Sequence, residues 1–159
     1  MKKISIGKEQ AIQRIRHYCA YQERAQQEVR DKLYELGMSK DEVEEILADL
    51  IEENFLNEER FAIQFAGGHF RIKGWGKLKI SQALNQKRVS AYNIKKALQS
   101  IDLDAYEQTL EALAKKKWES LKGVRGLGKI AKTQAFLHQR GFEPQLFQPI
   151  VQRLFKQQS

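Results

Sequence analysis

The chain has 159 residues, of which 42% are hydrophobic, 30% are charged and two are proline, and its formal net charge is +8. No apolar run approaches the ~18 to 20 residues that span a bilayer, and the N-terminal stretch lacks the apolar core of a secretory signal. One cysteine excludes an internal disulfide. We therefore expect a soluble, cytoplasmic protein without a membrane partner, and abundant Lys, Glu, Gln, Leu and Ala favour an all-α fold.

The first third of the chain predicts three helices. Apolar residues at helical spacing indicate one helix around Ile15 and a second that ends at Gly37, because glycine suits a left-handed C-cap. Ser39 and Glu42 have the spacing of a capping box and begin a third helix, whose apolar stripe runs to Ile51.

The middle third predicts three more helices. Asn57 caps the first, which ends at Gly74-Trp75-Gly76, and Ser90 caps the third. Arg88 stands where the first repeat has Gly37, so we expect the second helix of this repeat to close differently.

The last third has the same order of elements. A helix that ends near Trp118 is followed by a Gly-rich loop over Lys122–Gly128, in which Gly128 opens the next helix. That helix ends at Gly141, at a C-cap equivalent to the one in the first repeat. Pro144 then falls in the first turn of the last helix, where its missing N–H costs nothing.

A stretch of about 26 residues recurs three times without gaps, and 20 of its 21 aligned core positions are apolar. The aligned sets are Val29, Ile80 and Thr133; Leu33, Leu84 and Leu137; Met38, Val89 and Phe142; Val43, Ile94 and Phe147; Ile46, Ala97 and Ile150; Leu47, Leu98 and Val151; and Leu50, Ile101 and Leu154. This period predicts three tandem three-helix repeats, over residues 8–56, 57–103 and 104–157, in an elongated or curved arrangement that presents an extended surface to a large partner.

The net charge is distributed unevenly. Residues 1–56 carry a net charge of −3, residues 57–103 of +6 and residues 104–159 of +5. Such asymmetry is typical of a protein that meets a polyanion, most often nucleic acid, with one part of its surface. Lysines that only keep the chain soluble are the alternative.

Four segments resemble successive motifs of a known family. They are Ala25–Gly37 (AQQEVRDKLYELG), Leu56–Ala62 (LNEERFA), Gly74–Ile80 (GWGKLKI) and Leu137–Phe142 (LHQRGF). In this order, and with three-helix repeats, they are similar to the RecX regulatory proteins over about residues 8–156. Asn57 stands where the family usually has Asp, and the run after Gly76 is commonly richer in Arg.

The resemblance implies a monomeric, non-enzymatic regulator in DNA repair and recombination. Family members are elongated chains of three-helix repeats that lodge in the groove of the RecA filament on single-stranded DNA. They suppress its ATP hydrolysis and strand exchange and limit its growth. No catalytic, metal or cofactor residues are expected.

Basic side chains around Trp75 and Tyr92 suit phosphate contact combined with base stacking, although Trp75 between two glycines is also suited to filling a gap between helices. A second basic group surrounds the Gly-rich loop, and a solvated face is the alternative for it. The candidate contacts to RecA or DNA are Arg71, Lys73, Trp75, Lys77, Lys79, Lys87, Arg88, Lys95, Lys96, Lys122, Arg125, Lys129, Lys132 and Arg140.

Acidic residues crowd the third helix of the first repeat, from Asp41 to Glu53. A solvated amphipathic helix whose first turn matches the helix dipole is one interpretation. The other is that this acidic surface contacts protein while the basic repeats lie near DNA.

Two other function classes stay open. A three-helix unit also resembles helix-turn-helix modules, so a stand-alone DNA-binding protein is the main alternative. The run Gly123–Lys129 matches the start of a phosphate-binding loop, but Ile130 follows where a Mg²⁺-binding hydroxyl is needed, and a helix is expected before it. An ATP-dependent enzyme built on this loop would lose nucleotide binding on Lys129→Ala.

Overall fold

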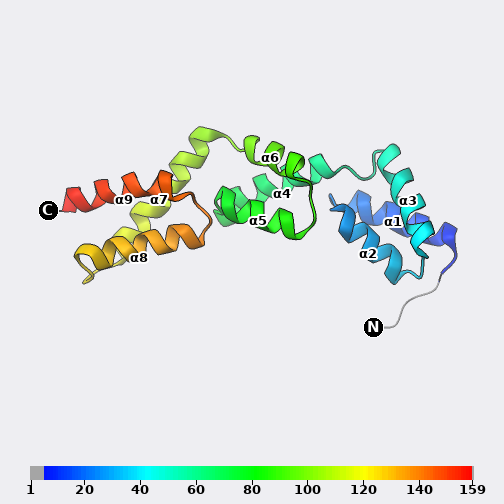
Figure 1. Ribbon diagram of the computed structural model, residues 1–159, viewed down its shortest axis with the longest axis horizontal. Helices are drawn as coiled ribbons and strands as arrows, with labels where there is room; N and C mark the ends of the chain where they lie inside the picture. Colours follow the sequence, from blue (N-terminus) through cyan, green and yellow to red (C-terminus); the bar gives the residue numbers. More distant parts are fainter. Residues whose placement is uncertain (1–5, 159) are drawn as a thin grey trace. The chain divides into compact units, whose positions relative to one another are not determined.

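A computed structural model describes residues 6–158, so most of the N-terminal stretch considered for a secretory signal lies outside the described residues. Within this range the chain forms nine helices and no strand (Figure 1). They are α1 (Lys8–Tyr21), α2 (Gln26–Glu35), α3 (Lys40–Glu52), α4 (Glu58–Lys73), α5 (Lys77–Gln86), α6 (Ala91–Gln99), α7 (Leu103–Ser120), α8 (Gly126–Gln139) and α9 (Pro144–Gln158). The predicted all-α class of tandem three-helix repeats is confirmed.

The described residues divide into two compact units. One comprises the chain up to Phe65 together with Leu84–Ala97, and the other comprises Ala66–Ala83 together with the chain from Leu98 onward. The helices of the second repeat therefore contribute to both units.

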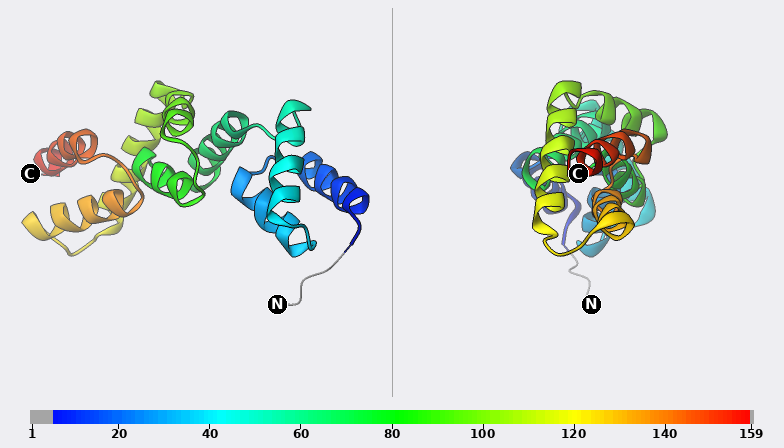
Figure 2. Two further views of the ribbon diagram at one scale, coloured as in Figure 1. Left: turned by 45° about the vertical axis from the view of Figure 1, so that its right-hand side comes forward. Right: turned by 90° about the vertical axis from the view of Figure 1, so that its left-hand side faces the viewer.

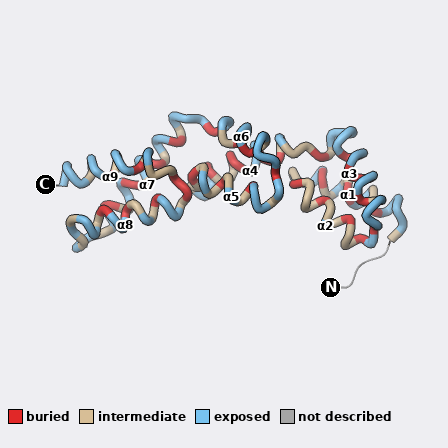
Figure 3. Tube along the Cα trace, in the orientation of Figure 1, coloured by how far each residue is buried: buried red, intermediate tan, exposed pale blue. Residues whose placement is uncertain are grey.

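In the first unit, α1, α2 and α3 pack on one another around a common core. Ile15, Val29 and Leu33 are fully buried there, and Cys19 lies at its edge. Removing each large aliphatic side chain from water contributes about 1.5–3 kcal/mol. Buried segments recur along these helices (Figure 3).

In the second unit, α7, α8 and α9 pack against one another (Figure 2). Tyr106, Leu110 and Ala114 line the buried face of α7, and Phe142 is fully buried between α8 and α9. The rings of Phe70 and Phe142 lie 5.6 and 5.3 Å from the ring of Tyr106, so aromatic contacts tie the end of α4 to this core.

The aligned core positions of the three repeats are buried, with three exceptions. Only Leu98, Ile150 and Leu154 are half-buried. Thr133, the one polar member, has no exposed surface, and its hydroxyl donates to the carbonyl oxygen of Lys129 (2.9 Å). The register read from the sequence is therefore the register of the core.

The helix starts are capped as the sequence predicts. Ser39 Oγ accepts from the N–H of Glu42 (3.3 Å), whose carboxylate accepts from the Ser39 N–H (3.0 Å), which completes a capping box. Asn57 and Ser90 accept from the N–H three residues later, at 2.8 and 3.2 Å. Such a cap is worth about 1 kcal/mol.

The helices α2, α5 and α8 end with the same backbone geometry. The prediction that α5, with Arg88 in place of glycine, ends differently is therefore wrong. Gly37, Arg88 and Gly141 have φ of 92°, 63° and 96°. In each case two N–H groups donate back to the last turn, at 2.9 to 3.1 Å. Arg88 thus adopts the left-handed conformation between two buried residues, Leu84 and Val89.

Candidate nucleic-acid interface

The junction between α4 and α5 places Trp75 among basic side chains. Its half-buried indole lies 4.7 Å from Lys79 Nζ and 5.4 Å from Lys73 Nζ, measured to the ring centroid. The His69 ring is 4.6 Å away, at a tilt of 44°. An indole beside two ammonium groups combines a surface for base stacking with charges for the adjacent phosphates.

Backbone hydrogen bonds position this junction. The N–H of Gly76 donates to the carbonyl oxygen of Arg140 (2.8 Å), and the N–H of Leu78 donates to that of Gly141 (2.9 Å). A Cβ on Gly76 would lie 2.4 Å from the Gly141 carbonyl carbon, and a Cβ on Gly141 would lie 2.3 Å from Lys79 Cβ. Both glycines are therefore required for two backbones to touch, and this contact holds Lys79 in place.

Arg140 joins the same region from the end of α8. Its Nη1 donates to the carbonyl oxygen of Lys73 (2.7 Å), and its guanidinium lies 5.1 Å from the Phe136 ring centroid. A cavity of about 460 Å³ is lined by Arg71, Lys73 and Arg140, together with Phe70 and residues of α7. The structure thus brings together five of the predicted residues, here called the Trp75 cluster: Arg71, Lys73, Trp75, Lys79 and Arg140.

Lys77 is oriented toward the core rather than toward Trp75. Its N–H donates to the hydroxyl of buried Tyr106 (2.8 Å), and its Nζ lies 4.9 Å from the Tyr106 ring centroid. The Tyr106 hydroxyl in turn donates to Glu143. Burial, followed by the bond to Glu143, raises the pKa of Tyr106 well above its usual range. Neither Tyr106 nor Glu143 belongs to a motif, so neither was predicted from the sequence.

The remaining basic residues of the second repeat belong to the first unit. Lys87 Nζ lies 6.0 Å from the Phe65 ring centroid, and Lys96 Nζ lies 5.6 Å from that of Tyr92, whose side chain is 66% exposed. Arg88 Nη1 donates to Gln27 Oε1 of α2 (3.4 Å), and Lys95 is exposed on α6. Lys87, Arg88 and Lys96 thus lie against three different side chains.

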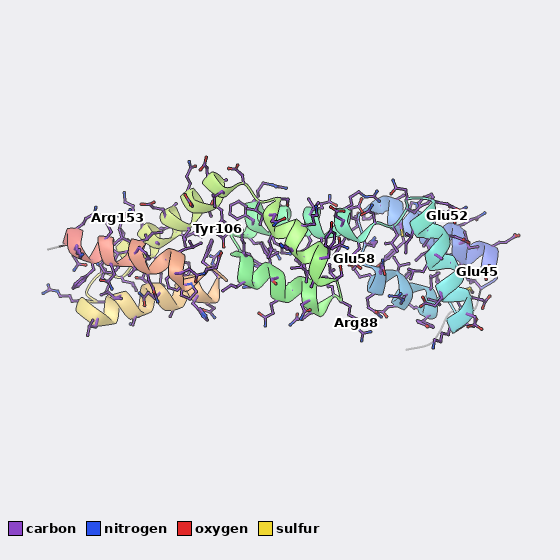
Figure 4. All side chains as sticks on the ribbon, turned by 45° about the horizontal axis from the view of Figure 1, so that its top comes forward. Glu45, Glu52, Glu58, Arg88, Tyr106 and Arg153 are labelled. Carbon is purple, nitrogen blue, oxygen red and sulfur yellow. The ribbon has the colours of Figure 1, made fainter. Side chains whose placement is uncertain are left out.

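Glu58, which was not predicted as a contact residue from the sequence, connects the starts of α4 and α6. Glu58 accepts from the N–H of Ser90 (2.8 Å) and from the side-chain amide of Asn93 (3.0 Å). Burial alone would raise the pKa of Glu58, but these hydrogen bonds outweigh it and lower the pKa. Arg60, two residues further along α4, donates to Glu23 and to the Asn54 side chain. Figure 4 labels Glu58 and Arg88.

The Gly-rich loop connects two helices, α7 and α8. Lys122 and Arg125 are exposed on the loop and Lys132 on α8, while Lys129 Nζ lies 4.5 Å from the Trp118 ring centroid. The helix begins at Gly126 rather than at Gly128, the start expected from the sequence. Because α7 precedes the loop, the strand that a phosphate-binding loop requires is absent there.

The acidic residues on α3 and at its C-cap are partly neutralised within the first repeat. Glu44, Glu45 and Glu53 pair with Arg30, Lys8 and Arg16, at 3.0, 3.2 and 2.9 Å. Such exposed pairs contribute about 0–1 kcal/mol each. The first-turn Glu42 has its pKa lowered by the Ser39 N–H and hydroxyl. Figure 4 shows Glu45 and Glu52 on this helix.

Across residues 6–158 no group of three or more His, Cys, Asp or Glu side chains could hold a metal ion. In the same range no helix is both long and apolar enough to cross a membrane.

Comparison with known proteins identifies the family. Models of the first, second and third three-helix domains of RecX match residues 11–50, 57–98 and 104–151. "Regulatory protein RecX" of Salmonella paratyphi A (strain ATCC 9150 / SARB42) is 30% identical over 141 residues, which is 82% of this chain and 83% of that protein. The chain belongs to the RecX family. The RecX protein of Salmonella typhimurium (strain LT2) is similar to the same extent.

Solved RecX structures share the fold. The crystal structure of RecX from Lactobacillus salivarius matches with a TM-score of 0.84 at 23% identity, over 92% of this chain and 96% of that one. A second crystal structure, of regulatory protein RecX, matches with a TM-score of 0.82 at 23% identity, over 90% of this chain and 70% of that one. The resemblance drawn from the four sequence motifs is confirmed.

Proposed function

We propose that this RecX-family protein is a monomeric cytoplasmic regulator that binds the RecA filament on single-stranded DNA. It modulates the filament, mainly by inhibiting ATP hydrolysis and strand exchange, in DNA repair and recombination. The family supports the regulatory role, since the relatives are named regulatory proteins. The Trp75 cluster is the observation that best supports a contact to a nucleoprotein filament, because it combines a stacking surface with four cations.

Several weak contacts on one chain explain how inhibition could arise. A repeat that is bound raises the effective concentration of the next repeat for its own site, so one chain can bridge adjacent protomers. A bridged filament resists the subunit rearrangements that ATP turnover and strand exchange require. The cations of the Gly-rich loop and Arg88 supply candidate contacts beyond the Trp75 cluster.

The test is steady-state ATP hydrolysis by RecA on single-stranded DNA, titrated with this protein below and above stoichiometry. We expect inhibition at substoichiometric amounts and a several-fold higher half-maximal concentration for Lys79→Gln. Lys40→Gln, a neutralised exposed lysine at the start of α3, serves as the matched control and should inhibit like the wild type. Equal inhibition by both variants would remove the Trp75 cluster from the proposal.

The same titration separates the two function classes. If hydrolysis is unaffected while the protein binds DNA directly, the stand-alone DNA-binding function is favoured. Tight, sequence-specific binding to duplex DNA in the absence of RecA would support that function further.

A further inference from the structure

A cavity on the α1–α2 side of the first repeat has no role in the proposed function. It is an open hollow of about 460 Å³, within the range of ligand sites, and is lined by residues of α1, by Arg24 in the loop that follows and by Lys32 of α2. Its walls include the rings of Tyr18 and Tyr21 and the cationic side chains of Arg14, Arg24 and Lys32. Tyr21 is 76% exposed, so its ring is open to a ligand.

Arg24 is held in place as part of the wall. Its guanidinium carbon lies 3.6 Å from the Tyr18 ring centroid and 6.0 Å from that of Tyr21, so the cation stacks on one ring and neighbours the other. Its Nε donates to the carbonyl oxygen of Tyr18 (2.9 Å), which fixes the plane of the group. An arginine ordered in this way loses less conformational entropy when it binds an anion.

The charge of this wall is opposite to that of the repeat. The residues lining the cavity include Arg14, Arg24, Lys32 and His17 but no carboxylate. Nearby acids have other partners: Glu23 binds Arg60, Glu28 accepts from the N–H of Ala25 (3.0 Å), and Asp31 accepts from the Gln27 amide (2.9 Å). Glu35 is 4.0 Å from Lys32, in a weak exposed pair.

We propose that this cavity, here called the Tyr21 site, binds a nucleotide of single-stranded DNA, with the base on the exposed Tyr21 ring and the phosphate among Arg14, Arg24 and Lys32. Both halves of a nucleotide are matched, because a base offers a flat π-face and its phosphate a charge that guanidinium groups bind bidentately. An acidic peptide would satisfy the cations but would leave the exposed ring without a partner.

The Tyr21 site extends the proposed function, which placed nucleic-acid contacts only in the second and third repeats. It assigns a DNA contact to the first repeat, although the net charge of −3 over residues 1–56 argues against one. The contact requires no RecA, so its test is independent of the filament assay.

The experiment measures binding of a fluorescein-labelled single-stranded oligodeoxythymidine to the full chain by fluorescence anisotropy, without RecA. We expect Tyr21→Ala to weaken binding about fivefold or more, while Tyr21→Phe, which keeps the ring, stays within about twofold of the wild type. Arg14→Gln should reduce the slope of log K against log salt by about 0.7, and Lys40→Gln, outside the site, should leave it unchanged. Thermal melting checks that each variant folds.

Photo-cross-linking locates the contact. An oligonucleotide that carries 5-iodouracil should cross-link to Tyr21 or Tyr18, as identified by mass spectrometry. Wild-type affinity of Tyr21→Ala, with cross-links confined to other repeats, would overturn the proposal. A second result would also overturn it. A glutamate-rich peptide would bind the wild type and bind Tyr21→Ala and Arg14→Gln more weakly, while both variants bound the oligonucleotide like the wild type.

Discussion

Arg88 and Gly141 occupy the same position at the ends of the second helices of their repeats, and both have positive φ, of 63° and 96°. The left-handed conformation costs a residue with a Cβ about 1–2 kcal/mol, and glycine avoids this cost. The second repeat therefore keeps an arginine where the other two repeats have the residue that suits the backbone. Residues held in sparsely populated conformations often serve function, which is consistent with Arg88 as a candidate contact.

Replacing Arg88 by glycine should stabilise the protein. We expect Arg88→Gly to raise the free energy of unfolding by about 0.5–1 kcal/mol, since strain is relieved but the unfolded chain gains freedom. Arg88→Ala keeps the strain and should bring no such gain. Urea denaturation measures both, and equal stability of the two variants would show that φ at this position stores no strain.

Two glycine substitutions in the second repeat should have opposite effects. A Cβ on Gly76 would lie 2.4 Å from the backbone of Gly141, so Gly76→Ala should destabilise the protein by about 1–3 kcal/mol. A Cβ on Gly68, inside α4, would have nothing within 4 Å, so Gly68→Ala should stabilise by about 0.5–1 kcal/mol through helix propensity. Thermal or urea unfolding of the pair tests this, and destabilisation by both variants would contradict it.

The core of this fold was predictable from the sequence because helical periodicity reports burial directly. Leu33, Leu84 and Leu137 were aligned by pattern alone, and all three are fully buried. Caps were predictable for the same local reason, since Ser39 and Asn57 act on N–H groups three residues away.

The contacts that shape the candidate sites were not predictable, because they join residues distant in sequence without a periodic signal. The Gly76–Gly141 contact and the chain from Lys77 through Tyr106 to Glu143 exist only in the folded unit. The cations around Tyr21 were not predicted as a group, because the net charge of the first repeat is negative. At Arg88, burial of the neighbouring apolar residues outweighed backbone preference.

The hydroxyl of Tyr106 should contribute to stability in a pH-dependent way. Tyr106→Phe leaves the N–H of Lys77 and the carboxylate of Glu143 without this partner, so we expect a loss of about 1–3 kcal/mol at pH 8. Folding raises the Tyr106 pKa above its unfolded value of 10.0, so the contribution is complete below pH 10 and is lost as the pH rises toward the folded pKa.

Urea denaturation of both proteins at pH 8 and pH 10.5 measures this dependence. The stability difference between wild type and Tyr106→Phe should shrink by about 1 kcal/mol at the higher pH. A constant difference would show that Tyr106 has an ordinary pKa in the folded protein.

Cys19 should react with thiol reagents only when the first repeat opens. Burial raises the pKa of this thiol to about 11, so little thiolate is present at neutral pH. Labelling by a chromogenic disulfide reagent at pH 8 should therefore be slow in buffer and fast in urea. Rapid labelling of the folded protein would contradict the burial of Cys19.

Thr133 is the polar member of an otherwise apolar alignment, and its replacement by valine should not harm the fold. Its hydroxyl is fully buried and donates only within its own helix, to the carbonyl oxygen of Lys129. Val29 and Ile80 hold the equivalent positions without a hydroxyl. We expect Thr133→Val to raise the free energy of unfolding by up to about 1 kcal/mol, because desolvation of the hydroxyl is avoided. Thr133→Ser keeps the hydroxyl but loses the methyl group and should lower the free energy of unfolding by about 1 kcal/mol. Urea denaturation compares the variants, and a serine variant more stable than the valine variant would show that the hydrogen bond outweighs packing.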